Sequence, residues 1–362
     1  MRRVLAASVV ALAVLAILGG WVATRSDDQP ELGSLLDRVV SAGAPGAFVV
    51  VREEGKLHGE ARGFADTGRA AAMRTDERFR IGSVTKTFVA ALVLLLVEDG
   101  RLRLGDPIER WLPGLIPRGR ETTVRHVLSH TSGLPDYVAD PRVLADPHRR
   151  WRPTELVALA LAPDLRPGHL GRFAYSSTNY IVLGLLAEEV GGAPLGSQLR
   201  HRLFEPLGLD ETSFVPGVVT GAHIHGHRSP SHQGVVTGPP VDTSDEPAWW
   251  TWGAGGIVST ADDVQRFFSA LLRGRVLGAA SLREMETLVP AGRQRYGLGI
   301  ATFPTPCGPA WGHTGNVGGT VAVAWNTHDA SRQVVLVINS YPLSGELEDA
   351  VRRLQHAAFC GG

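Results

Sequence analysis

The chain contains 362 residues, of which 44% are hydrophobic and 20% are charged. Lysine and arginine together number 36, as do aspartate and glutamate, so the formal net charge at pH 7 is +0. This balance excludes the basic surplus of a nucleic-acid-binding protein and the acidic, aromatic-poor composition of a disordered chain. The length favours two domains, or one domain with a large insertion.

The start of the chain has the pattern of an export segment. Two basic residues, Arg2 and Arg3, precede an apolar run from Val4 to Ala23. A charged start followed by an apolar run is typical of a signal peptide, and this run is also long enough to span a bilayer as a helix. The sequence predicts a cleaved signal peptide or an uncleaved signal anchor over 1–24. The protein is then secreted or anchored to the outer face of the cytoplasmic membrane, and it contacts a membrane only through this segment.

The next hundred residues contain a linker, a hairpin and a buried helix. Residues 25–35 are rich in Asp, Ser and Gly and predict a short linker. Apolar runs over 46–51 and 59–64 flank a Glu-Gly-Lys turn, which predicts a β-hairpin. Residues 83–98 are apolar on nearly every face, which is typical of a helix in the core of a sizeable domain, and Gly100 permits the chain to leave the helix.

The middle of the chain is helical and rich in loops. One helix is expected to open at Pro153, and another follows Ser177 and ends near Gly191. Residues 221–247 combine prolines, histidines and glycines, which predicts an irregular stretch. We therefore expect 101–249 to be a mainly helical insertion.

The last third combines helices and strands. Thr260 is a good N-cap for a helix, and strand-like patterns follow at 296–303, 319–325 and 333–339. A final helix is predicted over 347–359, where apolar residues recur at helical spacing.

Strands at both ends of the chain, with helices between them, predict a split domain. Its two parts are residues 36–100 and 250–362, which together form one α/β domain around the insertion.

Ser83 and Lys86 stand three residues apart at the start of the buried helix. One helical turn brings two such side chains to the same face, and the backbone N–H groups of a helix N-terminus suit an oxyanion. A buried lysine has a lowered pKa and could accept the proton of the serine hydroxyl. Taken alone, the spacing is also compatible with a capping serine beside a surface lysine.

Three further motifs follow this pair in a fixed order. They are His-Val-Leu-Ser-His-Thr-Ser-Gly-Leu at 126–134, Tyr-Ser-Ser-Thr-Asn-Tyr at 175–180 and His-Thr-Gly at 313–315. With these motifs the chain resembles the serine penicillin-recognising enzymes, in the branch that holds class C β-lactamases, D-alanyl-D-alanine carboxypeptidases and related esterases. The resemblance runs from about residue 36 to the C-terminus, and within the branch the chain is most similar to the exocellular actinomycete carboxypeptidase.

The resemblance implies a β-lactamase/transpeptidase-like α/β fold, in which helices flank an antiparallel sheet and a mainly helical subdomain is inserted. Ser83 would be the acylated nucleophile and Lys86 its proton-handling neighbour. Tyr175 would be the general base and later the general acid. His313 takes the place of the lysine in the Lys-Thr-Gly motif of other branches.

The resemblance also assigns residues to the substrate. The strand that carries Thr314, Gly315 and Asn316 would align the substrate backbone. The backbone N–H groups of Ser83 and Asn316 would form the oxyanion hole. Trp250 would line the substrate cleft.

The Ser-His-Thr-Ser-Gly stretch at 129–133 is a signature of the resembled family. We assign it a structural part, as a packed helix end, rather than a chemical one.

Two positions depart from the resembled pattern. The family pattern is Tyr-x-Asn, which here begins at Tyr175. Ser177 replaces the asparagine, and its hydroxyl can still donate a hydrogen bond but reaches less far than an amide. Ala301 stands where the resembled carboxypeptidase has an arginine for the terminal carboxylate of its substrate. The missing charge favours an esterase or aminopeptidase-like specificity, unless Arg293 or Arg295 supplies the charge from the preceding loop.

The chain has two cysteines, Cys307 and Cys360, and an even number in an exported protein favours a disulfide. Two separate thiols are the alternative. The resembled carboxypeptidase also joins a cysteine shortly before its His-Thr-Gly motif to one at the C-terminus.

Four histidines, His223, His225, His227 and His232, raise the hypothesis of a metal site. The first three would share one face of an extended strand. We find no carboxylate or cysteine that completes a ligand set, and the resembled family has a plain strand here, so we expect no metal and no cofactor.

We therefore expect an exported serine hydrolase that works through an acyl-enzyme. The favoured substrate is a D-alanyl-D-alanine stem peptide of peptidoglycan or another small acyl substrate, and β-lactams would inhibit by acylating the same serine. An esterase or β-lactamase on the same scaffold is one alternative. An alternative of another class is a catalytically poor cell-wall binding or sensor module, which the intact Ser83, Lys86 and Tyr175 disfavour.

Overall fold

The structure is a computed structural model that describes residues 31–146, 148–162, 167–232 and 235–361. The export segment expected over 1–24 lies outside these residues. Within the described ranges, no helix combines the length and the apolar character that crossing a bilayer requires.

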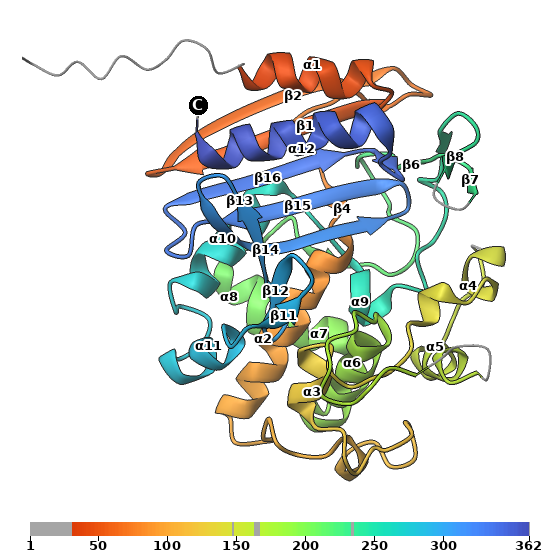
Figure 1. Cartoon of the computed structure of the whole chain (residues 1–362), viewed down its shortest axis with the longest axis vertical. Helices are drawn as coiled ribbons and strands as arrows, with labels where there is room; N and C mark the ends of the chain where they lie inside the picture. The colour runs from red at the N-terminus through yellow and green to blue at the C-terminus, as the bar shows by residue number, and fades with distance from the viewer. Residues whose placement is uncertain (1–30, 147, 163–166, 233–234, 362) are drawn as a thin grey trace, which may run out of the picture.

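The centre of the fold is a large antiparallel sheet (Figure 1). Within the described residues it contains nine strands, in the order β11 (Val289–Ala291), β12 (Gln294–Tyr296), β13 (Ala301–Thr305), β14 (Gly308–Val317), β15 (Thr320–Asn326), β16 (Arg332–Ile338), β1 (Gly46–Glu53), β2 (Lys56–Asp66) and β3 (Ala71–Ala72). The two ends of the chain meet where β1 pairs with β16. The predicted antiparallel sheet is therefore confirmed.

Two helices lie side by side over one face of this sheet (Figure 1). They are α1 (Leu32–Ser41) and α12 (Gly345–Cys360), and α12 confirms the predicted final helix. α1 buries Leu36 and Val39 against the strands, because apolar residues recur on one of its faces. The predicted linker over 25–35 is therefore wrong from the first residue of α1 onward.

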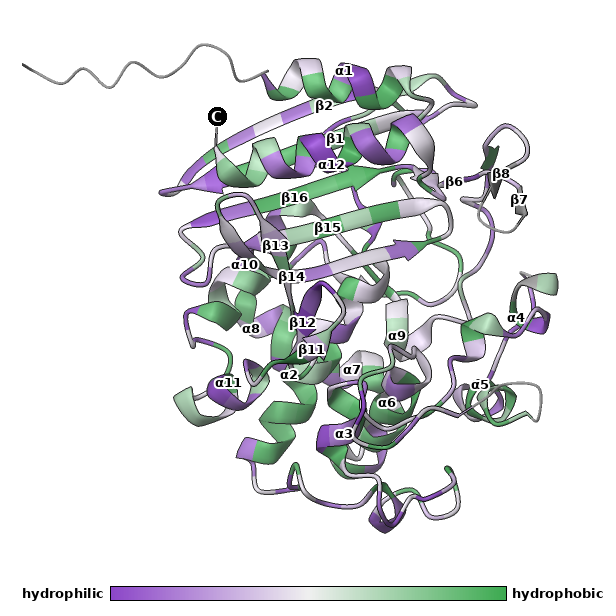
Figure 2. Ribbon diagram, viewed as in Figure 1, coloured by the Kyte–Doolittle hydropathy of each residue, from purple (hydrophilic) through white to green (hydrophobic). Residues whose placement is uncertain are grey.

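The other helices lie on the opposite side of the sheet and in the helical part below it. They are α2 (Thr85–Glu98), α3 (Val124–Leu128), α4 (Arg142–Ala145), α5 (Pro153–Ala160), α6 (Thr178–Gly191), α7 (Leu195–Leu199), α8 (Glu205–Leu207), α9 (Trp252–Gly255), α10 (Ala261–Leu272) and α11 (Ala279–Met285). α2 is hydrophobic along nearly its whole length (Figure 2) and packs against α6 and α9. The predicted core helix is confirmed, since a helix that is apolar all round must be covered on every face.

The predicted hairpin at the N-terminal side of the sheet is also present. β1 and β2 pair from Gly46 to Glu53, and the turn between them contains Glu54 and Gly55. Both turn residues have positive φ, at 48° and 80°, which matches the turn that best follows the twist of two paired strands.

The predicted strand over 296–303 is wrong as one element. It divides into β12 and β13, separated by a tight turn in which Gly297 N–H donates to Ile300 O at 2.7 Å. Gly299 has φ +83°, and a Cβ there would lie 2.3 Å from Ala90 of α2. The chain breaks here because Gly299 lets it approach the core helix α2 closely, while Gly297 packs directly against the backbone of Met285 in α11.

The middle segment contains short strands as well as helices. β5 (Ser213–Phe214) pairs with β10 (Ile257–Ser259), which pairs with β4 (Phe79–Arg80). Short two-residue strands occur within the stretch expected to be irregular, most of whose described residues lie outside strands: β6 (His227–Arg228), β7 (Ser231–His232), β8 (Val235–Val236) and β9 (Val241–Asp242). The small β5–β10–β4 sheet positions the active-site turn, because Ile81 N–H donates to Ile257 O at 3.1 Å directly beyond β4.

Candidate active site

Ser83 lies in the short 3₁₀ turn η1 (Gly82–Val84) that leads directly into α2. Its Oγ is 2.8 Å from Nζ of Lys86, as the spacing of three residues predicts. The same Nζ donates to the carbonyl of Ala254 in α9, also at 2.8 Å. The carbonyl holds the amine against the serine from the opposite side.

Lys86 has no solvent-exposed surface. Burial lowers the pKa of Lys86 to about 7, and the carboxylate of Asp136 opposes part of that shift. A lysine with this pKa is neutral in a large fraction of molecules near pH 7. A neutral amine in contact with the serine oxygen can accept the hydroxyl proton.

Tyr175 precedes α6 and points toward the nucleophile. Its ring centroid lies 5.2 Å from Nζ of Lys86, the amine that contacts Ser83 Oγ. The side chain is 41% exposed along the cleft, but loss of hydration around the hydroxyl raises the pKa of Tyr175. The tyrosine is therefore a neutral phenol in the free protein. This protonation state favours Lys86 over Tyr175 as the base in the first step, which differs from the role expected for Tyr175 from the resemblance.

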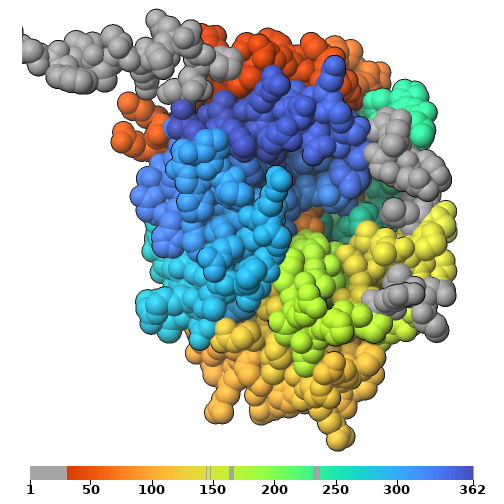
Figure 3. All heavy atoms as spheres, in the orientation of Figure 1, coloured from red at the N-terminus to blue at the C-terminus, as the bar shows by residue number. Residues whose placement is uncertain are grey.

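One edge of β14 faces this turn. β13 pairs with β14 only as far as Gly312, so the segment 313–317 has β15 on one side and η1 on the other. An unpaired strand edge can hold an extended substrate by main-chain hydrogen bonds. Figure 3 shows a hollow at this place, between blue atoms of the C-terminal part of the sheet and green atoms of the helical part.

Two glycines allow η1 and β14 to approach each other. A Cβ on Gly82, which has φ +52°, would lie 2.7 Å from the backbone N of Asn316. A Cβ on Gly315 would lie 2.7 Å from the backbone N of Ser83. The amides of Ser83 and Asn316 therefore border the same small space, as an oxyanion hole requires.

The remaining expected substrate residues differ in burial and in the elements that carry them. Thr314 is half-buried and Asn316 is exposed, while Ser177 is buried at the N-cap of α6. Trp250 is half-buried, and its carbonyl accepts a 2.6 Å hydrogen bond from the hydroxyl of Tyr137. Thr314 and Asn316 thus lie on the part of β14 that faces the Ser83 turn, and the substrate-binding roles of Ser177 and Trp250 stay predictions.

His313 is buried, and its ring nitrogens bond within the protein rather than to Ser83. Nε2 lies 3.0 Å from the hydroxyl of Tyr296, and Nδ1 lies 2.5 Å from the carbonyl of Thr314. Burial and the charge of Lys86 lower the pKa of His313 to about 3. The residue that replaces the usual motif lysine is therefore neutral at physiological pH.

Ala301 begins β13, where it is 2% exposed and packs with Phe303 in the core on the α1 and α12 side of the sheet. An uncharged, buried residue thus occupies the position of the family arginine. The two arginines considered as substitutes, Arg293 and Arg295, are exposed on the β11–β12 hairpin.

The two cysteines form a disulfide, as expected. The sulfur atoms of Cys307 and Cys360 are 2.16 Å apart, and the bond joins the β13–β14 turn to the end of α12. It fastens a covering helix to the strand that carries the His-Thr-Gly motif.

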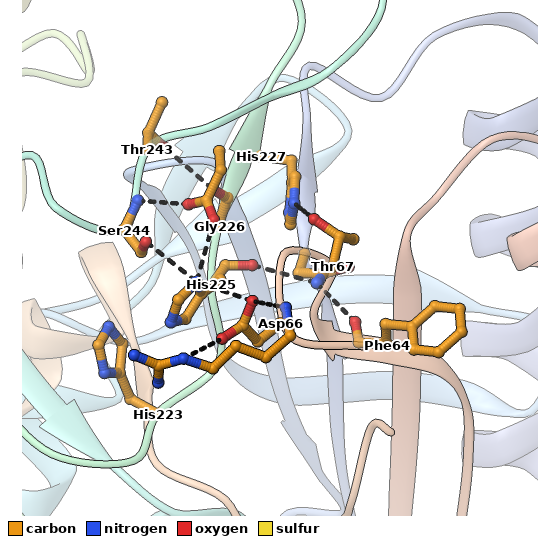
Figure 4. A network of polar contacts seen from close by, with 12 residues as sticks. Phe64, Asp66, Thr67, His223, His225, Gly226, His227, Thr243 and Ser244 are labelled. Atoms are coloured by element: carbon orange, nitrogen blue, oxygen red, sulfur yellow. Dashed lines mark hydrogen bonds and ion pairs between the residues drawn. The ribbon is translucent and has the colours of Figure 1, made fainter. Parts of the chain in front are cut away.

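The expectation that no carboxylate stands with the histidines is wrong. Nδ1 of His225 lies 3.0 Å from Asp242 and 3.7 Å from Asp66, which arrives from the end of β2 (Figure 4). These three side chains place their ligand atoms within 4.8 Å of one another. Sequence spacing cannot show this group, because tertiary packing brings Asp66 from far away in the chain.

The other histidines do not join this group in the same way. His227 turns to Thr67, with Nε2 3.0 Å from its hydroxyl, and His223 lies with its ring centroid 5.2 Å from that of His225. The side chain of His232 lies outside the described part of the structure. Arg69 also contacts Asp66, at 3.7 Å, so the group around His225 has the arrangement of a polar network that ties the end of β2 to the segment before β6 and to β9.

Sequence reasoning missed three residues around the catalytic turn. Asp136 lies near Lys86, and burial raises the pKa of its carboxyl. His130 packs against the ring of Tyr175, and Tyr296 hydrogen-bonds to His313. His130 belongs to the signature stretch at 129–133, to which we assigned a structural part. Tyr296 begins the stretch 296–303, which we predicted only as a strand. Both residues were therefore within recognised patterns, but neither was given a role in the site.

Comparison with known proteins agrees with this site. A family model described as Beta-lactamase matches residues 28–358. The chain belongs to the β-lactamase family, and it is a serine hydrolase of the superfamily that includes the penicillin-binding proteins.

Particular relatives differ in their activities. The chain is 32% identical to "Penicillin-binding protein 4" of Amycolatopsis lactamdurans, over 76% of this chain and 75% of that protein. It is 31% identical to "Esterase EstB" of Burkholderia gladioli, over 74% of this chain and 73% of that protein. With "Putative penicillin-binding protein PbpX" of Bacillus subtilis (strain 168) the identity is 27%, over 72% of this chain and 63% of that protein.

Solved structures show the same architecture. A D-stereospecific amidohydrolase from Streptomyces sp. superposes with a TM-score of 0.81 at 31% identity, over 92% of this chain and 100% of that one. A D-amino acid amidase from Ochrobactrum anthropi SV3, complexed with L-phenylalanine amide, gives a TM-score of 0.81 at 26% identity, over 90% and 97%. The chain is thus similar to amidases, esterases and penicillin-binding proteins alike.

Proposed function

We propose that this protein is an exported hydrolase that forms an acyl-enzyme at Ser83 with small D-aminoacyl substrates, and that it favours amides and esters without a terminal carboxylate. The observation that carries the acyl-enzyme step is the 2.8 Å contact between Ser83 Oγ and a buried lysine whose pKa is about 7. The apolar pattern before residue 24 and the disulfide support export.

The proposed first step transfers one proton and forms one covalent bond. Neutral Lys86 accepts the hydroxyl proton of Ser83 as Oγ attacks the carbonyl carbon of the substrate. The negative charge that develops on the carbonyl oxygen is held by the backbone N–H groups of Ser83 and Asn316. Tyr175 donates its hydroxyl proton to the leaving group as the substrate bond breaks, and Lys86 returns a proton to Tyr175.

Water completes the proposed cycle. Its oxygen attacks the acyl carbon while its proton passes through Tyr175 and Lys86 to Oγ of Ser83. The bond between Oγ and the acyl carbon breaks, which releases the acid and regenerates the Ser83 hydroxyl. β-Lactams acylate the same oxygen, because their ring carbonyl enters the same step.

The proposed preference for carboxylate-free substrates rests on two positions. Ala301 is uncharged and buried where the resembled carboxypeptidase has its arginine, and His313 is neutral where other branches have a lysine. A charge-assisted hydrogen bond is worth about 1.5–3 kcal/mol, which corresponds to about one to two decades in kcat/KM. We expect this protein to lack that gain for a substrate carboxylate.

A peptidoglycan carboxypeptidase acting on D-alanyl-D-alanine stem peptides is the second candidate. The likeness to Penicillin-binding protein 4 supports it, and so does the exposed pair Arg293 and Arg295, which could meet a carboxylate from the β11–β12 hairpin.

Three substrates with the same D-alanyl acyl part separate the two candidates. They end in D-alanine, in D-alaninamide or in a neutral ester, so only the first carries a carboxylate. We expect the amide-capped peptide to be hydrolysed at least as fast as the free acid, and the ester fastest. A preference for the free acid by a decade or more would instead support the carboxypeptidase. Replacing Arg293 and Arg295 with glutamine would then show whether the hairpin supplies the charge.

A further inference from the structure

Beneath the catalytic turn, three buried side chains form a continuous line of hydrogen bonds. His130 Nε2 lies 3.2 Å from the hydroxyl of Tyr296, and that hydroxyl lies 3.0 Å from Nε2 of His313. The three residues come from the loop after α3, from β12 and from β14. All three are buried, with exposed fractions of 0%, 3% and 4%.

Fixed backbone groups at the two ends determine which atom of the line carries each proton. At one end, Nδ1 of His313 faces the carbonyl of Thr314, which can only accept, so Nδ1 carries a hydrogen. At the other end, the backbone N–H of Ser176 points at Nδ1 of His130 from 3.2 Å, so this Nδ1 must accept.

The side-chain amide of Asn179 confirms the second end. Its oxygen is 2.5 Å from the hydroxyl of Ser132, which leaves its NH₂ group to face Nδ1 of His130 at 3.2 Å. A neutral imidazole has one donor and one acceptor, so the rest of the line follows. His130 Nε2–H donates to the Tyr296 oxygen, and the Tyr296 hydroxyl donates to Nε2 of His313.

We propose that His130 and Tyr296 are positioning residues, which lock His313 as a neutral, fully bonded imidazole beside the catalytic turn and hold Tyr175 in place. The proposal rests on the proposed function in one respect, since acyl transfer at Ser83 is the step that it positions. His313 then takes no proton from the substrate and gives none, because both of its nitrogens are occupied inside the protein.

Two further observations support a functional part for His130. Its ring centroid lies 4.3 Å from that of Tyr175, with 30° between the ring planes, so the imidazole packs against the ring of the catalytic phenol. Its backbone has φ +56°, an unfavourable region for a residue with a Cβ. Such strain persists where the surroundings fix a residue for a purpose, as at active sites.

Charged and titratable groups around His313 agree with a neutral ring. The groups that face it are Lys86 of α2, Tyr296 of β12, Tyr175 ahead of α6 and His130 after α3. None of these is an acid that would stabilise an imidazolium ion, and Lys86 opposes a second positive charge. The cleft therefore has one ionisable amine beside the nucleophile rather than the two that a lysine at position 313 would provide.

Nitrogen NMR of the two histidines tests the proposed arrangement without any turnover. We expect His313 as the Nδ1–H tautomer and His130 as the Nε2–H tautomer, both remaining neutral from neutral to mildly acidic pH. In Tyr296→Phe, Nε2 of His313 loses its hydrogen-bond donor while Nδ1–H keeps the Thr314 carbonyl, so the Nε2 resonance should shift and His313 should begin to titrate at mildly acidic pH. A wild-type His313 that is protonated at neutral pH, or that carries its hydrogen on Nε2, would overturn the proposal.

Acylation kinetics test the positioning role. The rate of covalent labelling of Tyr296→Phe by an activated ester should fall about tenfold through kcat, with KM nearly unchanged, since the hydroxyl does not touch substrate. The matched control is Tyr137→Phe, which also removes one buried hydroxyl, but one that bonds to the Trp250 carbonyl instead of a histidine. It should leave the histidine spectra unchanged, and equal changes in both variants would contradict the proposal.

Two variants of His130 separate hydrogen bonding from ring packing. Glutamine can still donate to Tyr296 but has no ring, whereas phenylalanine keeps the ring under Tyr175 and loses all three hydrogen bonds of the imidazole, to Tyr296, Ser176 and Asn179. We expect His130→Gln to retain several times more acylation activity than His130→Phe. Higher acylation activity in His130→Phe than in His130→Gln would show that the ring acts only through packing. It would overturn the proposal that the hydrogen bonds from His130 through Tyr296 position His313. If every variant and the wild type are inactive on all esters while the wild-type spectra show the expected tautomers, the proposed function fails and the hydrogen-bond line stands.

Discussion

Ser83 and Lys86 are in direct contact, and the chemistry of the pair depends on the burial of the lysine. An exposed lysine is almost entirely protonated at pH 7 and cannot accept a proton. With its pKa lowered to about 7, Lys86 is neutral often enough to serve as the base. The raised pKa of Tyr175 keeps the phenol protonated and available as a donor to the leaving group.

Substitution of the lysine tests this division of roles. Lys86→Arg should lose nearly as much acylation activity as Lys86→Ala, because arginine keeps the positive charge but stays protonated. The measurement is the rate of covalent labelling of each purified variant by a β-lactam. An arginine variant that retained most of the wild-type rate would show that Lys86 acts only as a charge.

The acylation rate should also depend on pH in a defined direction. The reactive form is the neutral amine, which is present above the pKa of Lys86 and disappears as the pH falls through about 7. We expect kcat/KM for a neutral ester to fall about tenfold per pH unit below that value. Stopped-flow acylation at constant ionic strength measures this dependence. A rate that stays flat over about two pH units below 7 would exclude Lys86 as the base.

At the scale of elements, catalysis depends on how closely η1 approaches β14. Gly82 and Gly315 are the residues that permit this approach, since a Cβ on either would meet backbone atoms of the facing element. The small β5–β10–β4 sheet fixes the turn from the other side through the bond between Ile81 and Ile257. Two sheets thus hold the nucleophile in one place.

Gly315→Ala should separate these two elements. A Cβ there would lie 2.1 Å from Ile81 O and 2.7 Å from Ser83 N, so β14 or η1 must move. A displacement of about 1 Å at an active site can lower kcat/KM by about two orders of magnitude. The control is Gly105→Ala, where a Cβ meets nothing within 4 Å. Equal activity of the two variants would show that the close approach is not required.

Elements with a continuous apolar pattern could be predicted from the sequence. α2 and α12 were found in this way. A helix buried on every face is a continuous apolar run, and a helix buried on one face has apolar residues at helical spacing. β14 has no such pattern, since Gly308, Gly312 and Gly315 interrupt its alternation, and only the His-Thr-Gly resemblance located it. The break before Ala301 was missed because it depends on contact with α2.

The same limit applies to the candidate site. Ser83, Lys86 and Tyr175 could be predicted, because each stands in a motif whose residue types match a chemical step. The line from His130 to Tyr296 and His313 could not, since its members are 166 and 17 residues apart in sequence and become neighbours only through the packing of the helical part against the sheet. The carboxylate partners of His225 were missed for the same reason.

At the scale of the whole molecule, the fold joins the two ends of the chain in one sheet and covers it with α1 and α12. The Cys307–Cys360 disulfide closes a loop of 53 residues and fastens α12 to this sheet. A cross-link over that length contributes about 4 kcal/mol to the free energy of unfolding on the chain-entropy model. The bond therefore stabilises the arrangement that carries β14.

Replacing both cysteines with serine should lower the free energy of unfolding by up to about 4 kcal/mol. Urea denaturation followed by circular dichroism measures the change, and wild-type protein with and without reductant provides the control. An unchanged midpoint after reduction would show that the disulfide does not restrain the unfolded chain.

The central claim is that Ser83 becomes acylated, and intact mass spectrometry tests it most directly. Wild-type protein and Ser83→Ala are incubated in parallel with a β-lactam and with an activated D-alanyl ester, and the mass of each whole chain is measured. The account predicts that the wild type gains the mass of one acyl group from each reagent. Ser83→Ala should gain none, although it keeps its fold, because the Ser83 side chain caps neither η1 nor α2 and its removal leaves the helix start unchanged. A stoichiometric adduct on Ser83→Ala, or no adduct on the wild type with either reagent, would contradict the account.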